Sequence, residues 1–133
     1  MKLSTFMVIN AIVAAVFGIA FVVAPGQATS LYGVAESAQL EYTAQLFGAA
    51  LLAFGVLTWF ARNAADSDAR RAILRALFVG DGVGCVVALI GQLGGVVNAM
   101  GWSTVAIYFL LALGFGYFLY ATPGRAETPG QAA

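Results

Sequence analysis

Residues 75–97 read RALFVGDGVGCVVALIGQLGGVV, and this stretch decides the fold class. After Arg75, its only charged residue is Asp81. A helix needs roughly 20 apolar residues to cross a hydrocarbon core about 30 Å thick. The stretch therefore predicts a transmembrane helix over about 76–97.

Three further apolar stretches have the length of a membrane span. They cover about 3–24, 42–61 and 99–121, and the first stops at the helix-ending pair Pro25-Gly26. A β-barrel is the weaker interpretation, because barrel strands are short and alternate between apolar and polar residues, whereas these runs are continuous. We therefore expect an all-α, polytopic membrane protein whose four transmembrane helices form a compact antiparallel bundle.

The composition agrees with a membrane protein and excludes several functions. Hydrophobic residues make up 62% of the chain and charged residues 9%, against about 45–50% and 25% in soluble domains. The net charge of zero argues against a nucleic-acid partner. The lack of histidine and the single cysteine exclude Ser–His and Cys–His catalysis, a disulfide framework and thiolate zinc sites. We expect no cofactor, no metal and no enzymatic activity.

The basic residues predict the orientation in the membrane. They precede the first span, flank the connection between the second and third spans, or follow the fourth: Lys2, Arg62, Arg70, Arg71, Arg75 and Arg125. The other two connections, 26–40 and 94–100, contain no lysine or arginine. Because Lys and Arg are enriched in cytoplasmic loops, we expect both termini in the cytoplasm and the protein in a bacterial inner membrane.

Segments outside the spans carry expectations of their own. Segment 26–40 predicts a short interfacial helix over residues 31–35, and residues 66–68 (Asp-Ser-Asp) predict the N-cap of the third helix. The tail 122–133, rich in Pro, Gly and Ala, predicts disorder. A cleaved signal peptide over residues 1–28 is the alternative for the first span, although its apolar run is longer than the usual 7–15 residues.

Small residues recur at four-residue spacing on the predicted helices. In lipid, helices associate through close backbone approach at such residues rather than through the hydrophobic effect. The residues expected to serve this packing are Gly80, Gly84 and Ala88 on the third helix, Gly48 on the second and Gly18 on the first.

Polar residues at membrane depth are the candidate site. At 100° per residue, Asp81 and Gln92 share a face of the third helix with small residues, which predicts that this face points inward. Depth along the helices predicts two interhelical hydrogen bonds, Asn10–Asp81 and Gln45–Gln92. The remaining members of the expected polar seam are Glu41, one turn from Gln45, and Thr104 with Tyr108 on the fourth helix.

Two interpretations of this polar seam lead to different functions. In the first, the seam holds helices together, and the protein has a structural or accessory role, packing against itself as a homodimer or against a larger membrane complex. In the second, Asp81 carries a proton or cation, and the protein is a small proton-linked transporter of a hydrophobic or cationic solute. Replacement of Asp81 by asparagine separates the two interpretations. The amide keeps the hydrogen bonding that a structural role needs, but it cannot carry a proton or a negative charge.

The layout is similar to that of short bacterial four-helix membrane proteins of DoxX-like appearance. The resemblance is carried by Pro25, by residues 31–34 (LYGV), by residues 45–50 (QLFGAA) and by Gly55. It implies a four-helix membrane fold and no established activity.

Overall fold

A computed structural model of the protein describes residues 1–121; the tail predicted to be disordered, 122–133, lies outside the described residues. All regular secondary structure in the described part is helical, with no strand. Its elements are α1 (Leu3–Val23), α2 (Pro25–Ser30), α3 (Ala38–Ala61), α4 (Asp68–Leu93), α5 (Gly101–Gly116) and the π-helical segment η1 (Tyr117–Ala121). Four helices are long and apolar enough to cross a membrane: α1, α3, α4, and α5 together with η1.

Helix boundaries differ from the expected spans where local caps decide them. The Ser37 side chain accepts a hydrogen bond from the Leu40 amide (3.2 Å) and starts α3 one turn early. The Ser67 side chain accepts one from the Arg70 amide (3.2 Å), which confirms the N-cap predicted at residues 66–68 and places the start of α4 two turns before the expected span. At the other end, α4 stops at Leu93 instead of residue 97, because Gly95 takes a positive φ of 72° that ends the helix.

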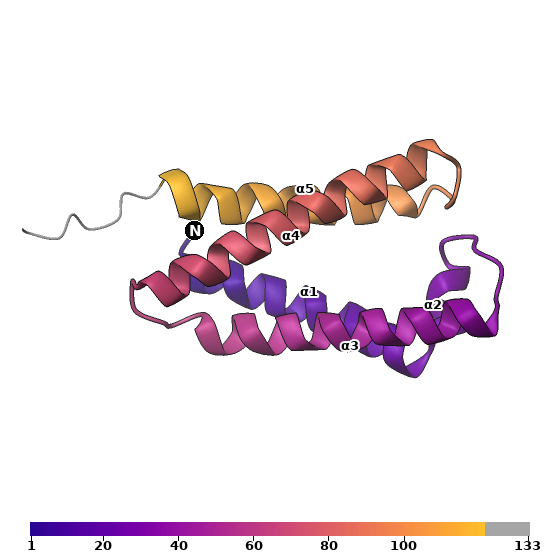
Figure 1. The fold of residues 1–133 in the computed structure, drawn as a ribbon, viewed down its shortest axis with the longest axis horizontal. Coiled ribbons are helices and arrows are strands. Elements are labelled where there is room, and N and C mark those ends of the chain that lie inside the picture. Colours follow the sequence, from indigo (N-terminus) through magenta and orange to yellow (C-terminus); the bar gives the residue numbers. More distant parts are fainter. Residues whose placement is uncertain (122–133) are drawn as a thin grey trace, which may run out of the picture.

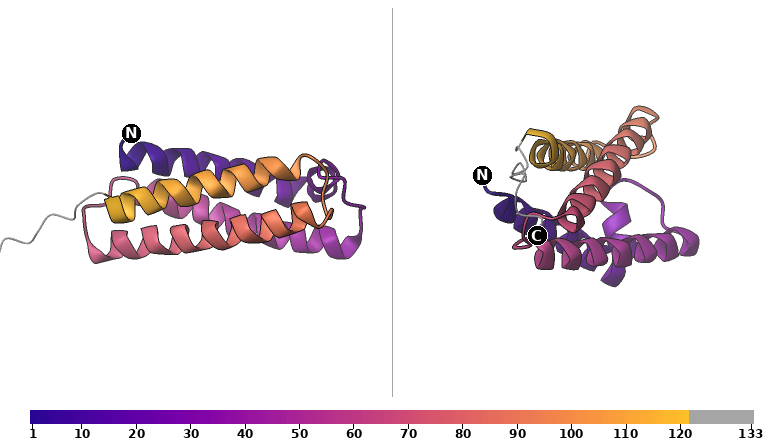
Figure 2. Two further views of the ribbon diagram at one scale, coloured as in Figure 1. Left: turned by 90° about the horizontal axis from the view of Figure 1, so that it is seen from above. Right: turned by 60° about the vertical axis from the view of Figure 1, so that its left-hand side comes forward.

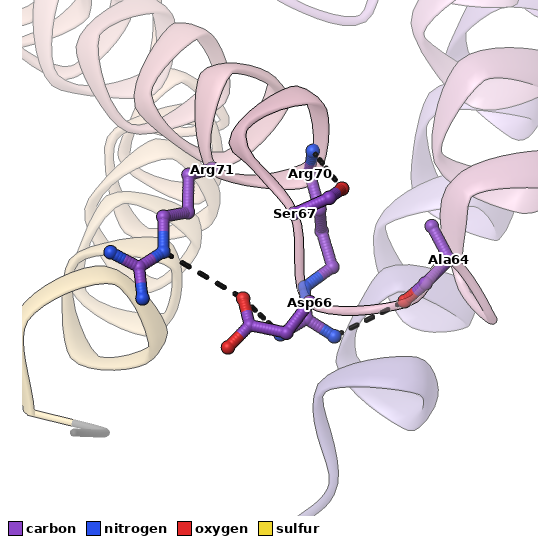
Figure 3. Close-up of polar contacts among 5 residues, drawn as sticks. All are labelled: Ala64, Asp66, Ser67, Arg70 and Arg71. Atoms are coloured by element: carbon purple, nitrogen blue, oxygen red, sulfur yellow. Dashed lines mark hydrogen bonds and ion pairs between the residues drawn. The ribbon is translucent and has the colours of Figure 1, made fainter. Parts of the chain in front are cut away.

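Ion pairs order the connection between α3 and α4 (Figure 3). The Asp66 carboxylate lies 2.9 Å from the Arg70 guanidinium and 3.7 Å from that of Arg71. Arg70 also donates to the Ala64 carbonyl (3.1 Å), which ties the start of α4 to the end of α3. Together with Lys2, these arginines mark one end of the molecule, called here the basic end.

The short helix between the first two long helices lies earlier in the chain than expected. The chain leaves α1 at Val23 and starts α2 immediately, with Pro25 in its first turn, where its missing N–H is not needed. Residues 31–33 form a turn rather than a helix, and Gly33 has a positive φ of 73°. The apolar spacing of residues 31–35 was misleading because Pro25 nucleates the helix six residues before it.

The four long helices form two antiparallel hairpins, α1 with α3 and α4 with α5 (Figures 1 and 2). In the first, Gly18 and Gly48 face each other at the end near α2, while Asn10 lies beside Thr58 toward the basic end. In the second hairpin, Gly84 lies against the Tyr108 ring. Helices of the same hairpin pack closely along their length, whereas the two hairpins diverge between their ends.

An aromatic cluster joins the hairpins at the basic end. The Phe6 ring of α1 lies 4.9 Å from the ring of Phe115, edge to face, and 5.7 Å from that of Phe118. Met7 and Phe115 are fully buried there. These rings belong to a buried apolar cluster, which is called here the aromatic cluster after them and consists of Phe6, Met7, Ala61, Leu74, Leu77 and Phe115.

Asn98 joins the hairpins at the opposite end. Its backbone amide donates to the Tyr32 carbonyl (2.9 Å), and its side-chain amide donates to the Leu31 carbonyl (2.9 Å). Its side-chain oxygen accepts from the Met100 amide (2.9 Å), which holds the side chain in place. Near it, the Thr104 hydroxyl donates to the Tyr32 hydroxyl (3.1 Å).

We expect Asn98→Ala to loosen this end selectively. The variant loses two side-chain hydrogen bonds, each contributing about 0.5–1.5 kcal/mol, and hydrogen exchange of the amides of residues 31–33 and 98–101 should accelerate. The control is Asn63→Ala, which replaces an exposed asparagine at the basic end. It should leave hydrogen exchange at residues 31–33 and 98–101 unchanged. Equal exchange in both variants would show that Asn98 does not hold the hairpins together.

Candidate functional site

Between the two diverging hairpins lies a chamber of about 570 Å³. Residues from all four long helices, from α2 and from both connections at the end opposite the basic end line it. The aromatic cluster closes the chamber at the basic end, and the Tyr32–Asn98 contacts close it at the other. Its size falls in the range of about 300–1,000 Å³ typical of small-molecule sites.

The wall of the chamber is mainly apolar and rich in aromatic rings. Phe17 and Phe21 of α1 stack with their centroids 6.5 Å apart. Phe21 also meets Phe47 of α3 edge to face at 5.6 Å. Tyr32, Phe54 of α3 and Tyr108 of α5 complete the aromatic lining. Such a wall favours an apolar or cationic guest over an anionic one.

Asp81 is the only charged residue among the described residues that line the chamber. It is half-buried on α4, and its Oδ2 atom is buried with no hydrogen-bond partner among the described residues. Arg75, the nearest basic residue along α4, is exposed. An unpaired carboxyl at membrane depth is costly, and such groups usually mark a substrate or ion site.

The expected Asn10–Asp81 hydrogen bond is not made. Asn10 is buried and donates instead to the Thr58 hydroxyl of α3 (3.3 Å), which itself donates to the Phe54 carbonyl (2.9 Å). The cause is the pairing of helices, because α1 packs along α3, where Asn10 finds its partner, and meets α4 mainly in the aromatic cluster. Asn10 and Asp81 therefore line the same chamber but are not hydrogen-bonded to each other.

The expected Gln45–Gln92 bond is also absent. Gln45 belongs to the first hairpin and donates to the Val22 carbonyl of α1 (3.2 Å). Gln92 belongs to the second, where its side chain lies against Gly101 and its Oε1 atom is buried without a hydrogen-bond partner among the described residues. Glu41 lies near Gly26 of α2 and, like both glutamines, does not line the chamber.

Thr104 and Tyr108 do line the chamber, one turn apart on α5. Thr104 donates a hydrogen bond to the Tyr32 hydroxyl at the end opposite the basic end. Tyr108 packs its ring against Gly84, three residues from Asp81 on α4. Tyr32 and Thr29 also line the chamber and were not predicted to do so, since they lie in α2 and in the connection after it, whose path the sequence does not reveal. The aromatic wall was not predicted either, because the spacing of Phe17 and Phe21 is equally typical of a lipid-facing helix.

The small residues on α4 separate into two roles. Gly84 meets the Tyr108 ring, as packing requires, but Gly80 has no neighbour within 4 Å and lines the chamber, as does Ala88. On the first hairpin, Gly18 and Gly48 bring α1 and α3 into backbone contact. Among these small residues, Gly84 therefore makes a close helix contact, whereas Gly80 and Ala88 border the chamber.

The chamber opens sideways between the hairpins. Phe47 and Phe54 of α3 and Val87 of α4 line it and are nevertheless 43%, 46% and 63% exposed. The chamber is therefore open at the molecular surface, which between the long helices of a membrane-spanning protein is the surface that faces lipid.

Comparison with known proteins gives no assignment: no family model, no curated protein and no solved structure matches the chain. Among the described residues, no group of three or more His, Cys, Asp or Glu side chains could hold a metal ion. The chamber and its single carboxyl are therefore the features on which a function can be argued.

Proposed function

We propose that this protein binds a small, mainly apolar solute within the membrane, in the chamber between its two hairpins. The observation that carries the proposal is an aromatic-lined chamber, open toward lipid, with one unpaired carboxyl in its wall. A purely structural role for Asp81 would require hydrogen bonds from neighbouring helices, and the described residues supply none to Oδ2.

The proposal places the protein in a bacterial inner membrane with both termini in the cytoplasm. The basic residues support this, since Lys2 follows the N-terminus, the arginines flank the α3–α4 connection, and Figure 1 shows the N-terminus and this connection at the same end of the molecule. The chamber then closes on the cytoplasmic side with the aromatic cluster and on the outer side with the Tyr32–Asn98 contacts. We propose the two closed ends as the gates of a carrier that exchanges a proton for its solute at Asp81.

Saturable binding of a neutral apolar probe tests the proposal. The purified protein in phosphatidylcholine nanodiscs is titrated with N-phenyl-1-naphthylamine, and the fluorescence of empty nanodiscs is subtracted. We expect saturation at one probe per chain. Fluorescence that rises linearly and equally in empty and loaded nanodiscs would mean that the probe only partitions into lipid, and would refute a binding chamber.

An accessory role is the second candidate, and α4 provides the observation that favours it. Gly82, like Gly80, has no neighbour within 4 Å, although small residues in membrane helices commonly bring two helices into contact. A partner helix from a second copy or from a larger complex would fill this space. Chemical cross-linking in native membranes tests it, since Gly82→Leu should abolish a cross-linked species that this contact holds.

A further inference from the structure

We infer that the solute held in the chamber is an amphiphilic amine, whose protonated nitrogen pairs with Asp81 and whose apolar body extends along the aromatic wall. This inference rests on the proposed binding function and specifies the class of solute. Three observations carry it: the unpaired carboxyl, the distribution of charge around the chamber and the chamber's long axis.

The carboxyl of Asp81 requires a donor that the described residues do not supply. Its Oδ2 atom is buried without a hydrogen-bond partner, and the ion pairs of the described residues are both made by Asp66, at the basic end. A buried carboxylate without a partner is strongly unfavourable, whereas a carboxylate paired with a cation and hydrogen-bonded to it is not. An ammonium group provides both the charge and the N–H donor.

The rest of the lining favours a cation and disfavours an anion. None of the described lining residues is lysine or arginine, so nothing there would neutralise a carboxylate or phosphate on the solute. The Tyr108 ring lies over Gly84, three residues from Asp81 on the same helix. The negative faces of aromatic rings attract ammonium groups, and the ring is placed next to the carboxyl that would bind one.

The chamber is long in the direction of the helices. Asp81 lies near the middle of α4, and Gly91, which also lines the chamber, lies ten residues further along α4, away from the basic end, or about 15 Å at 1.5 Å per residue. Most lining residues beyond Asp81 are apolar, among them Phe21, Phe47 and Ile107, and the polar ones there, such as Thr104 and Tyr108, are uncharged. A solute with a single charged head and an elongated apolar body fits this distribution, and such a molecule also reaches the chamber through the lipid.

A matched pair of ten-carbon molecules tests the inference. Decylamine and 1-decanol are compared as competitors of N-phenyl-1-naphthylamine in phosphatidylcholine nanodiscs, at equal mole fractions in the bilayer. Because hydrogen bonds to charged groups are the stronger kind, we expect the amine to compete about tenfold to a hundredfold better. Asp81→Asn should remove this preference while the decanol still competes, and Glu36→Gln, which removes an exposed carboxylate outside the chamber, should retain it.

The outcomes separate the solute class from the binding function. Equal competition by the amine and the alcohol in the wild-type protein would overturn the amine inference but not the proposed binding function. This comparison does not depend on whether a variant folds. A preference that persists in Asp81→Asn would overturn it as well. If neither molecule displaces the probe and the probe itself does not saturate, both the inference and the proposed function fail.

Discussion

Gly48→Leu is expected to separate α1 from α3 and to destabilise the protein by about 3 kcal/mol, at the upper end of the range for overpacked interiors. A Cβ atom at Gly48 would lie 2.8 Å from the Gly18 carbonyl oxygen and 2.9 Å from the Phe21 Cβ. Both are backbone or backbone-proximal atoms that cannot move without shifting the helix. A leucine there must therefore push the two helices apart, and the first hairpin loses its closest contact.

Gly82→Leu is the matched control for this substitution. It places the same side chain on a membrane helix at a glycine with open space around it, so the free energy of unfolding should stay within about 0.5 kcal/mol of the wild type. Reversible unfolding in mixed detergent micelles, followed by circular dichroism, measures both variants. Equal stability of Gly48→Leu and Gly82→Leu would contradict the close approach of α1 and α3.

Ala88→Phe is expected to weaken binding of N-phenyl-1-naphthylamine by at least about a hundredfold, equivalent to about 2.7 kcal/mol of binding free energy. Ala88 lies on the chamber side of α4, between the levels of Asp81 and Gly91. An aromatic ring attached there occupies the space that the probe needs. The chamber is open to lipid at Val87, so the added ring has room without disturbing the contacts between α4 and α5.

Val86→Phe controls for the added ring. Val86 lies two residues away on the same helix, is 57% exposed and does not line the chamber, so its variant should bind the probe as the wild type does. Nanodisc titrations of the two variants, at equal protein content verified by circular dichroism, provide the comparison. Equal loss of binding in both would indicate an effect of helix bulk or lipid packing rather than occupation of the chamber.

The sequence predicts the helices of this fold better than it predicts their neighbours. The four long apolar helices follow from run length and composition, and Ser67 marks the start of α4 because its cap is a local interaction. The hydrogen-bond partners of polar side chains depend on which helices are neighbours, and the depth of a residue along its helix does not reveal this. Asn10 and Asp81 line one chamber without bonding to each other for this reason, with Asn10 bonded to Thr58 within its own hairpin.

The chamber itself could not be read from the chain. Gly80 and Ala88 are spaced like residues at a close helix contact, yet they border open space, because a small side chain permits contact or cavity equally well. Asp81 was identifiable as a candidate site residue from the sequence alone, because placing an ionisable side chain within a membrane span costs free energy. That its Oδ2 atom lacks a partner among the described residues is a property of the tertiary arrangement.

Mapping where a bound probe lies tests the central claim of a chamber between the hairpins. A diazirine-bearing analogue of N-phenyl-1-naphthylamine is photoactivated in nanodiscs, and the labelled residues are identified by mass spectrometry with and without excess unlabelled probe. We predict displaceable labels on the chamber-lining residues Phe54, Val87 and Ile107. Labels confined to outward-facing residues such as Val56, Val86 and Leu110, and unaffected by competition, would contradict the claim.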